Sequence, residues 1–176
     1  MSDHPADARP GRLRDVTAAE RQRAREMLDL ENGLGSVPVL DEVGALTILR
    51  TARRIAIVGA SEDPRRPSHS VMRYLQHQGY ECVPINPNAR DVLGMPAFAT
   101  LEEAVTATGP FDIVDVFRRP EHAADVARSA VATHCAALWL QLGVVSWDAA
   151  RIAHEAGLPV VMDRCTAIDH RLLRGR

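Results

Sequence analysis

The turn Gly59-Ala60-Ser61 is the first place in the sequence where residue types and spacing indicate chemistry. It follows an apolar run of strand length, and a helix is predicted to open near Ser68. Gly59 lets the backbone approach a ligand closely, and the helix end supplies unpaired amides and a partial positive charge, as a pyrophosphate site requires. The full Gly-x-Gly-x-x-Gly pattern is absent, because Ser61 and Pro64 stand where further glycines would be. The turn predicts phosphate binding without naming the ligand, and a tight turn followed by a Ser68 helix cap is the alternative.

The end of the second predicted strand, Asn86-Pro87, distinguishes between nucleotide ligands. Proteins that bind NAD usually end this strand in an acidic residue that bonds the ribose, about 20 residues past the glycines. Asp91 lies several residues further on, in a predicted loop. Arginines surround the predicted site in the sequence: Arg65, Arg66, Arg90, Arg118 and Arg119. A ligand richer in phosphate than NAD suits this pattern, and solvated surface is the alternative role of each arginine.

The sequence contains no lysine, so its 21 positive side chains are all arginine. A Walker phosphate loop needs its lysine, and Schiff-base catalysis needs a lysine amine. The composition therefore excludes P-loop nucleotide hydrolysis, pyridoxal phosphate enzymes and class I aldolases. Phosphates must be bound by arginine, backbone amides or helix ends.

From Arg54 onward, apolar runs of strand length alternate with amphipathic segments of helix length, as in βαβ units. The predicted strands cover residues 54–59, 80–86, 111–117, 136–142 and 158–162. We expect an α/β fold, a Rossmann-like doubly wound five-stranded parallel sheet in the order 3-2-1-4-5. A ligand of such a sheet lies outside the carboxyl ends of the strands, where most of the polar residues discussed above fall.

Residues 1–40 are predicted to form a partly helical N-terminal extension, and residues 41–176 the Rossmann-type domain. In the extension, Thr17-Ala18-Ala19-Glu20 has the pattern of a capping box that opens a helix to about Leu30. Asp41 is expected to cap a second helix at the start of the domain.

Length and composition limit the class of protein. The 176 residues fit one domain with an appendage, and the longest apolar runs fall far short of the roughly 20 residues of a membrane span. The first residues lack the apolar stretch of a secretory signal, so a cytoplasmic location is expected, with no membrane partner. Three cysteines without metal-like spacing argue against a disulfide framework or a zinc site. A net charge of −2 makes nucleic acid an unfavourable partner.

Six sequence blocks carry a family resemblance. They are Ile57-Val58-Gly59-Ala60-Ser61; Pro64, Arg66 and Ser68; Pro84-Ile85-Asn86-Pro87 with Gly94; the run from Asp112 to Arg118; Trp139 to Val144; and Asp163-Arg164-Cys165. In this order and spacing, over residues 41–173, the chain resembles the small stand-alone CoA-binding proteins of the YccU type. That family is similar to the CoA-binding domains of the succinyl-CoA synthetase α subunit and of ADP-forming acyl-CoA synthetases. In those enzymes the phosphorylated histidine lies in a further domain.

The resemblance implies coenzyme A, or an acyl-CoA, as the ligand. Gly59 to Ser61 and the following helix end would hold its pyrophosphate. Asn86 and Pro87 would border the adenosine pocket, with Arg90 or Arg65 near the ribose 3′-phosphate. The pantetheine arm would pass Phe117, Arg118 and Pro120. The predicted binding set is completed by Arg66, Ser68 and Cys165.

No residue set forms a recognisable catalytic constellation. Cys165 falls at the end of the fifth predicted strand, where a CoA thiol could pair with it as a mixed disulfide, and a structural thiol is the alternative. Asp115 lies inside an apolar strand and needs a buried partner such as an arginine or a helix cap. We expect a non-catalytic CoA-binding or regulatory module, with a homodimer or another protein partner left open. The alternatives are an NAD(P)-dependent oxidoreductase or redox sensor and an accessory subunit of an acyl-CoA synthetase.

Overall fold

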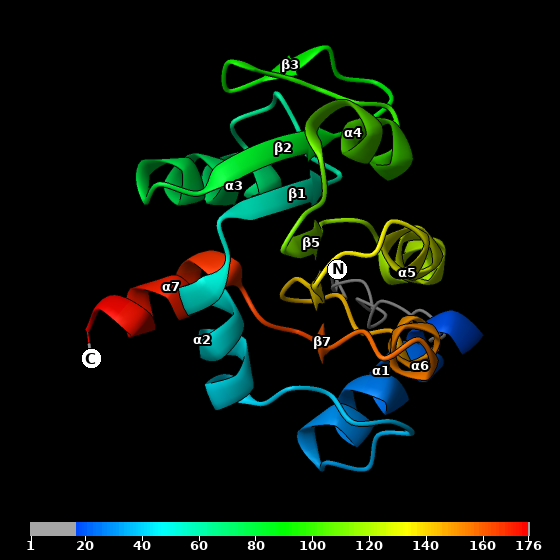
Figure 1. Cartoon of the computed structure of the whole chain (residues 1–176). Helices are drawn as coiled ribbons and strands as arrows, with labels where there is room; N and C mark the ends of the chain where they lie inside the picture. The colour runs from blue at the N-terminus through cyan, green and yellow to red at the C-terminus, as the bar shows by residue number, and fades with distance from the viewer. Residues whose placement is uncertain (1–16, 176) are drawn as a thin grey trace, which may run out of the picture.

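A computed structural model describes residues 17–175 and contains a five-stranded parallel sheet between two layers of helices (Figure 1). The sheet has the order β2-β1-β5-β6-β7. Its strands are β1 (Arg54–Val58), β2 (Glu81–Ile85), β5 (Ile113–Val116), β6 (Ala137–Leu140) and β7 (Val160–Val161). A separate two-stranded antiparallel sheet, which the sequence did not predict, pairs β3 (Asp91–Val92) with β4 (Met95–Pro96). The predicted α/β Rossmann-like fold class is confirmed.

The predicted strand order 3-2-1-4-5 is wrong. Counting only the five strands of the large sheet, the order is 2-1-3-4-5, because the third strand, β5, pairs with β1 rather than with β2. The outer edge of β2 is occupied by Phe98, whose N–H donates to the Pro84 carbonyl oxygen over 3.0 Å. Pro84 has no N–H to offer a neighbouring strand, and proline within a sheet is confined to edge strands. The strand order therefore reverses between β1 and β5, which is where a ligand is expected to lie.

Six helices cover the two faces of the sheet (Figure 1). One face is packed by α2 (Glu42–Thr51), α3 (Pro67–His77) and α7 (Thr166–Arg174). The other is packed by α4 (Leu101–Thr108), α5 (Ala123–Ala132) and α6 (Trp147–Glu155). Along β1, Ile55 and Ile57 belong to the first apolar cluster and Ala56 and Val58 to the second, as the two-residue period of a strand requires. Burial of both faces explains the nearly continuous apolar runs in the sequence.

Helix boundaries follow the expected caps with one correction. The predicted capping box is present at α1 (Ala18–Glu31), and Asp41 caps α2 by accepting from the Gly44 N–H over 2.9 Å. Ser68 is not the cap of α3: Arg66 takes that position, Pro67 is the first helical residue, and Ser68 is buried in the first turn. Proline is favoured at the first helical position because its missing N–H has no intrahelical partner there. The helix α7 was not predicted.

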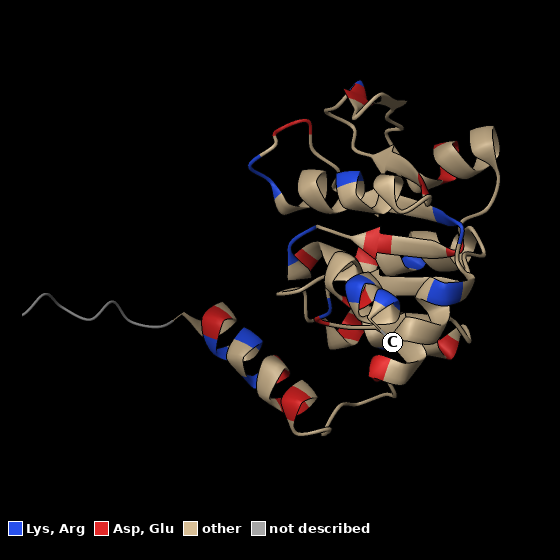
Figure 2. Ribbon diagram, turned by 90° about the vertical axis from the view of Figure 1, so that its left-hand side faces the viewer, with Lys and Arg blue, Asp and Glu red and all other residues tan. Residues whose placement is uncertain are grey.

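The N-terminal extension packs at one end of the molecule. No residue of α1 is buried, and the helix carries both signs of charge along its length (Figure 2). The indole N–H of Trp147 in α6 donates to the Glu26 carbonyl oxygen of α1 over 3.2 Å. Leu30, Val37 and Val39 are half-buried against the core of the domain. The division at residue 40 stays a prediction, and residues 1–16 of the predicted extension lie outside the described residues.

Gly35 of the extension packs directly against the Trp147 ring, and a Cβ atom at this position would overlap the ring. We expect Gly35→Ala to displace the extension at a cost of about 1–3 kcal/mol, the usual penalty of overpacking. Limited proteolysis should then cut the segment around residues 30–40 faster while the sheet domain survives. Gly33→Ala is a poor control because Gly33 has a φ of +65°, so Ser36→Ala serves instead. Unchanged cleavage of Gly35→Ala would contradict the contact.

Candidate ligand-binding site

A pocket of about 660 Å³ lies at the carboxyl edge of the sheet, beside the reversal of strand order. Eight of the predicted binding residues line it: Gly59, Ser61, Arg66, Ser68, Asn86, Phe117, Arg118 and Cys165. They come from the ends of β1, β2, β5 and β7 and from the start of α3. The sheet edge therefore brings together residues that are more than 100 positions apart in the sequence.

The turn after β1 requires glycine for two reasons. Gly59 has a φ of +87°, and a Cβ atom there would lie 3.2 Å from the carbonyl carbon and oxygen of Phe117. The turn is fixed from β2, because the Gly59 N–H donates to the Ile85 carbonyl oxygen over 2.9 Å. The Asn86 side chain also donates to the Ala60 carbonyl oxygen over 2.7 Å. Ala60 itself is fully buried and lines neither pocket of the edge, so its contact with a ligand stays a prediction.

A second pocket of about 300 Å³ adjoins the first and shares Gly59, Arg118 and His122 with it. Pro87, another predicted binding residue, lines this smaller pocket together with residues at the start of α4 and along α5. The two pockets meet at the Gly59 turn. Their arrangement suits a long ligand whose middle part passes the turn and whose two ends lie in different pockets.

The arginines of the edge differ in what neutralises them. Arg66 and Arg118 line the larger pocket, and neither has an ion-pair partner among residues 17–175. Arg119 lines the same pocket but lies 3.3 Å from Glu121. A guanidinium without a carboxylate partner in a recess favours an incoming anion, and arginine matches phosphate oxygens with its planar set of donors.

Besides Ala60, three predicted binding residues lie apart from both pockets. The Arg65 side chain is 88% exposed and pairs with Asp63 over 2.9 Å, which lowers the pKa of that carboxyl. Arg90 is exposed, and its backbone N–H donates to Glu62 over 3.2 Å. Pro120 begins the short 3₁₀ helix η1 (Pro120–His122) and lines neither pocket. Their contact with a ligand stays a prediction.

Asp115 has neutral partners, not the arginine or helix cap that the sequence suggested. It is fully buried at the centre of the sheet, and both of its carboxylate oxygens accept from the Gln141 amide, over 2.8 and 2.9 Å. The Thr166 hydroxyl donates to the same carboxylate over 3.0 Å. Burial raises the pKa of Asp115 to about 7, and the two hydrogen bonds oppose that rise. The spacing of Trp139 and Gln141 could have identified Gln141 as a partner of Asp115. Trp139 lies opposite Asp115 in the sheet, and a residue two positions later points to the same face as Trp139.

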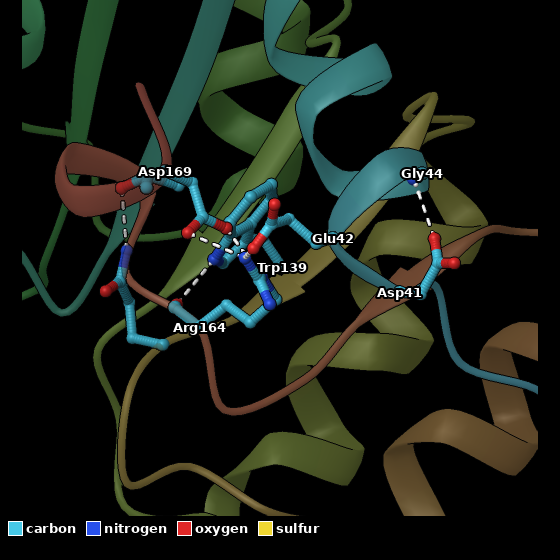
Figure 3. A network of polar contacts seen from close by, with 8 residues as sticks. Asp41, Glu42, Gly44, Trp139, Arg164 and Asp169 are labelled. Atoms are coloured by element: carbon cyan, nitrogen blue, oxygen red, sulfur yellow. Dashed lines mark hydrogen bonds and ion pairs between the residues drawn. The ribbon is translucent and has the colours of Figure 1, made fainter. Parts of the chain in front are cut away.

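The segment that carries Cys165 is held rigidly on both sides (Figure 3). The Trp139 indole N–H donates to the Arg164 carbonyl oxygen over 2.7 Å, and the Arg164 guanidinium binds Asp169 in α7 over 2.6 and 2.9 Å. Glu42 of α2 lies 3.7 Å from the same guanidinium. Cys165 faces the larger pocket from this segment and is half-exposed.

The sequence model of the CoA binding domain family matches residues 53–171 of the chain. The chain belongs to this family. The match spans every strand of the sheet and confirms the resemblance that the sequence blocks indicated. Within residues 17–175 this CoA-binding-domain protein has no helix long and apolar enough to cross a membrane.

Three relatives of this CoA-binding-domain protein cover most of its length. The uncharacterized protein YneT of Bacillus subtilis is 39% identical over 127 residues, which are 72% of this chain and 92% of YneT. The structure of cell-free ID.343 from Thermus thermophilus is 37% identical with a TM-score of 0.70, covering 76% of this chain and 99% of that one. Prb, the PH1109 protein redesigned for binding, is 33% identical with a TM-score of 0.73, covering 80% and 96%.

The buried carboxyl predicts how stability depends on pH. Because the pKa of Asp115 rises from 3.8 to about 7 on folding, the folded chain keeps a proton that the unfolded chain has lost between these values. The contribution of Asp115 to the free energy of unfolding is therefore fully present below pH 3.8 and is lost as the pH rises to about 7. Each unit of pKa difference between the folded and unfolded chain corresponds to about 1.4 kcal/mol.

Asp115→Asn should lack this decline. Urea denaturation of both proteins at several pH values between 3.8 and 7 measures the difference in slope. Asp148→Asn, at an exposed carboxyl of α6, is the matched control and should keep the slope of the unmodified chain. Parallel declines in the unmodified chain and Asp115→Asn would show that Asp115 does not retain the proton.

Proposed function

We propose that this protein binds coenzyme A or an acyl-CoA as a non-catalytic binding or regulatory module. The observation that carries the proposal is the pair of pockets meeting at the Gly59 turn, with Arg66 and Arg118 unpaired by carboxylates among the described residues. Membership of the CoA-binding domain family supports the same ligand class.

The shape of CoA matches the order of these features along the sheet edge. Its pyrophosphate would lie at the turn from Gly59 to Ser61, facing the first turn of α3, where helix dipole and backbone amides favour an anion. Arg118 lines both pockets and would bind a phosphate at their junction. The adenosine would occupy the smaller pocket beside Pro87, and the pantetheine arm the larger pocket toward Cys165. Arg65 or Arg90 would reach the 3′-phosphate from the exposed rim.

The geometry after β2 disfavours the nicotinamide alternative. Asn86 stands where NAD-binding proteins usually carry an acidic residue for the ribose. Its amide nitrogen donates to the Ala60 carbonyl oxygen, and its amide oxygen accepts from the Asn88 backbone N–H over 2.9 Å. Both ends of the amide are used within the protein, so Asn86 has the role of fixing the turn.

Thermal shifts with CoA, dephospho-CoA and NAD test the proposed ligand. A ligand that binds only the folded state stabilises it by about 2.7 kcal/mol at 100 times its dissociation constant. We expect CoA to raise the melting temperature most, dephospho-CoA less because it lacks the 3′-phosphate, and NAD least. Stabilisation by NAD equal to that by CoA would refute the proposal.

Arg118→Gln provides a variant for the same measurement. It removes a charge from both pockets, and loss of a hydrogen bond to a charged group costs about 1.5–3 kcal/mol, or roughly 10-fold to 100-fold in affinity. Arg151→Gln is the matched control, because Arg151 is an exposed arginine of α6 that pairs with Asp148 and Glu155 and lines neither pocket. The control should bind CoA as the unmodified chain does.

Cysteine labelling tests the direction of the pantetheine arm. Cys82 and Cys135 are buried, which raises the pKa of each thiol to about 12, whereas Cys165 opens on the larger pocket. Thiolates are the reactive form, so iodoacetamide should modify Cys165 first, and bound CoA should slow that reaction. The nucleotide 3′-phospho-ADP, which lacks the arm, is the control ligand. Equal protection by both ligands would contradict this placement of the arm.

A further inference from the structure

Gln141 combines deep burial with a place in the wall of the larger pocket. It follows β6 directly, and its side chain is only 4% exposed. Its amide nitrogen donates to both oxygens of Asp115 and lies 2.8 Å from the Thr166 hydroxyl oxygen. The donor capacity of this amide is therefore used entirely within the protein.

The partners of Gln141 determine which way its amide faces. The Gln141 NH₂ group donates to both Asp115 oxygens, so the amide oxygen faces away from the carboxyl. The ionised carboxylate only accepts hydrogen bonds, so this orientation is enforced at a pH above the Asp115 pKa of about 7. The amide oxygen has no hydrogen-bond partner among residues 17–175. It is also not fully buried, because the one fully buried side-chain N or O atom without a partner in that range is Nδ1 of His69. The Gln141 oxygen is therefore open, and the space in front of it is the pocket.

The surroundings of this oxygen limit what it can bind. The pocket wall contains donors, among them the guanidinium groups of Arg66 and Arg118, and apolar side chains, those of Phe117, Leu142 and Val144. Leu142 and Val144 follow Gln141 closely in the chain, so the wall beside Gln141 is in part apolar. An acceptor in an apolar wall matches a neutral N–H donor, since a donor buried there without a partner loses its hydrogen bonds to water.

We propose that the amide oxygen of Gln141 accepts a hydrogen bond from an amide N–H of the pantetheine arm, and that Asp115 and Thr166 are positioning residues that fix its direction. This inference rests on the proposed function and identifies the part of CoA that the site recognises beyond its phosphates. Pantetheine contains two secondary amides, and each needs an acceptor when water is removed. Anchorage on the adjacent strands β5 and β6 holds the acceptor in place before the ligand arrives, which reduces the entropy lost on binding.

The test compares CoA with 3′-phospho-ADP, which has the nucleotide end of CoA but no amide. Gln141→Met keeps the length of the side chain and removes the acceptor. Isothermal titration should show CoA binding about 10-fold weaker in this variant, the effect of one lost hydrogen bond, and unchanged binding of 3′-phospho-ADP. Gln76→Met, on α3 and outside both pockets, is the matched control and should leave both affinities unchanged.

Asp115→Asn is the second variant, in case Gln141→Met, which leaves Thr166 as the remaining donor to Asp115, fails to fold. Asparagine fits the same space but can both donate and accept, so it no longer forces the Gln141 oxygen toward the pocket. CoA should again lose affinity while 3′-phospho-ADP does not, a difference that a general loss of stability would not produce.

The possible outcomes separate the two proposals. Equal weakening of both ligands, or an unchanged affinity for CoA in both variants, overturns the role of Gln141 and leaves the proposed function intact. An unmodified chain that binds neither CoA nor 3′-phospho-ADP overturns the proposed function, and the role of Gln141 with it.

Discussion

The close passage of the Gly59 turn against the end of β5 is the constraint on which the binding edge depends. The Phe117 N–H donates to the Val58 carbonyl oxygen over 2.8 Å, which brings the backbone of the two strand ends together. Only a residue without a side chain fits between them in the left-handed conformation that Gly59 adopts. The turn consequently separates two pockets, and Arg118, which follows Phe117, borders both. A Cβ atom at position 59 would lie 3.2 Å from the Phe117 carbonyl group, which is tighter than an ordinary van der Waals contact, so a side chain there would crowd the junction.

A second constraint acts from inside the sheet. A carboxyl group buried in the middle of β5 costs free energy unless it is fully hydrogen-bonded. Asp115 meets this condition with Gln141 from β6 and Thr166 from the start of α7, so three elements are joined at one buried point. Both partners are neutral, and the low polarity of the site keeps the pKa of the carboxyl near 7 rather than near 4. The network fixes the start of α7, whose N-cap residue Cys165 lines the larger pocket.

Much of the site could be predicted from the sequence because it consists of strand ends, which are local features. Gly59, Asn86 and Arg118 each follow an apolar run, and parallel strands bring such positions to one edge. The strand order could not be predicted in the same way, because it depends on which long-range pairings form. Pro84 carried the missing signal, since a proline marks β2 as an edge strand. The partners of Asp115 were also hidden: Thr166 is 51 residues away in the sequence.

The distribution of charge suits the proposed ligand, whose two ends differ chemically, in an arginine-rich chain without lysine. Several arginines of the described chain are bound to carboxylates, as Arg164 is to Asp169. Arg119, at the rim, shares Glu121 with Arg23 of the extension, which lowers its availability to a ligand. Arg66 and Arg118 line the larger pocket and have no carboxylate within ion-pair distance among residues 17–175, so their guanidinium groups can bind a phosphate there. The same pocket is lined by Gln141, whose amide oxygen is an acceptor, by the Cys165 thiol and by apolar side chains, which suits the neutral amide chain that follows the phosphates in CoA.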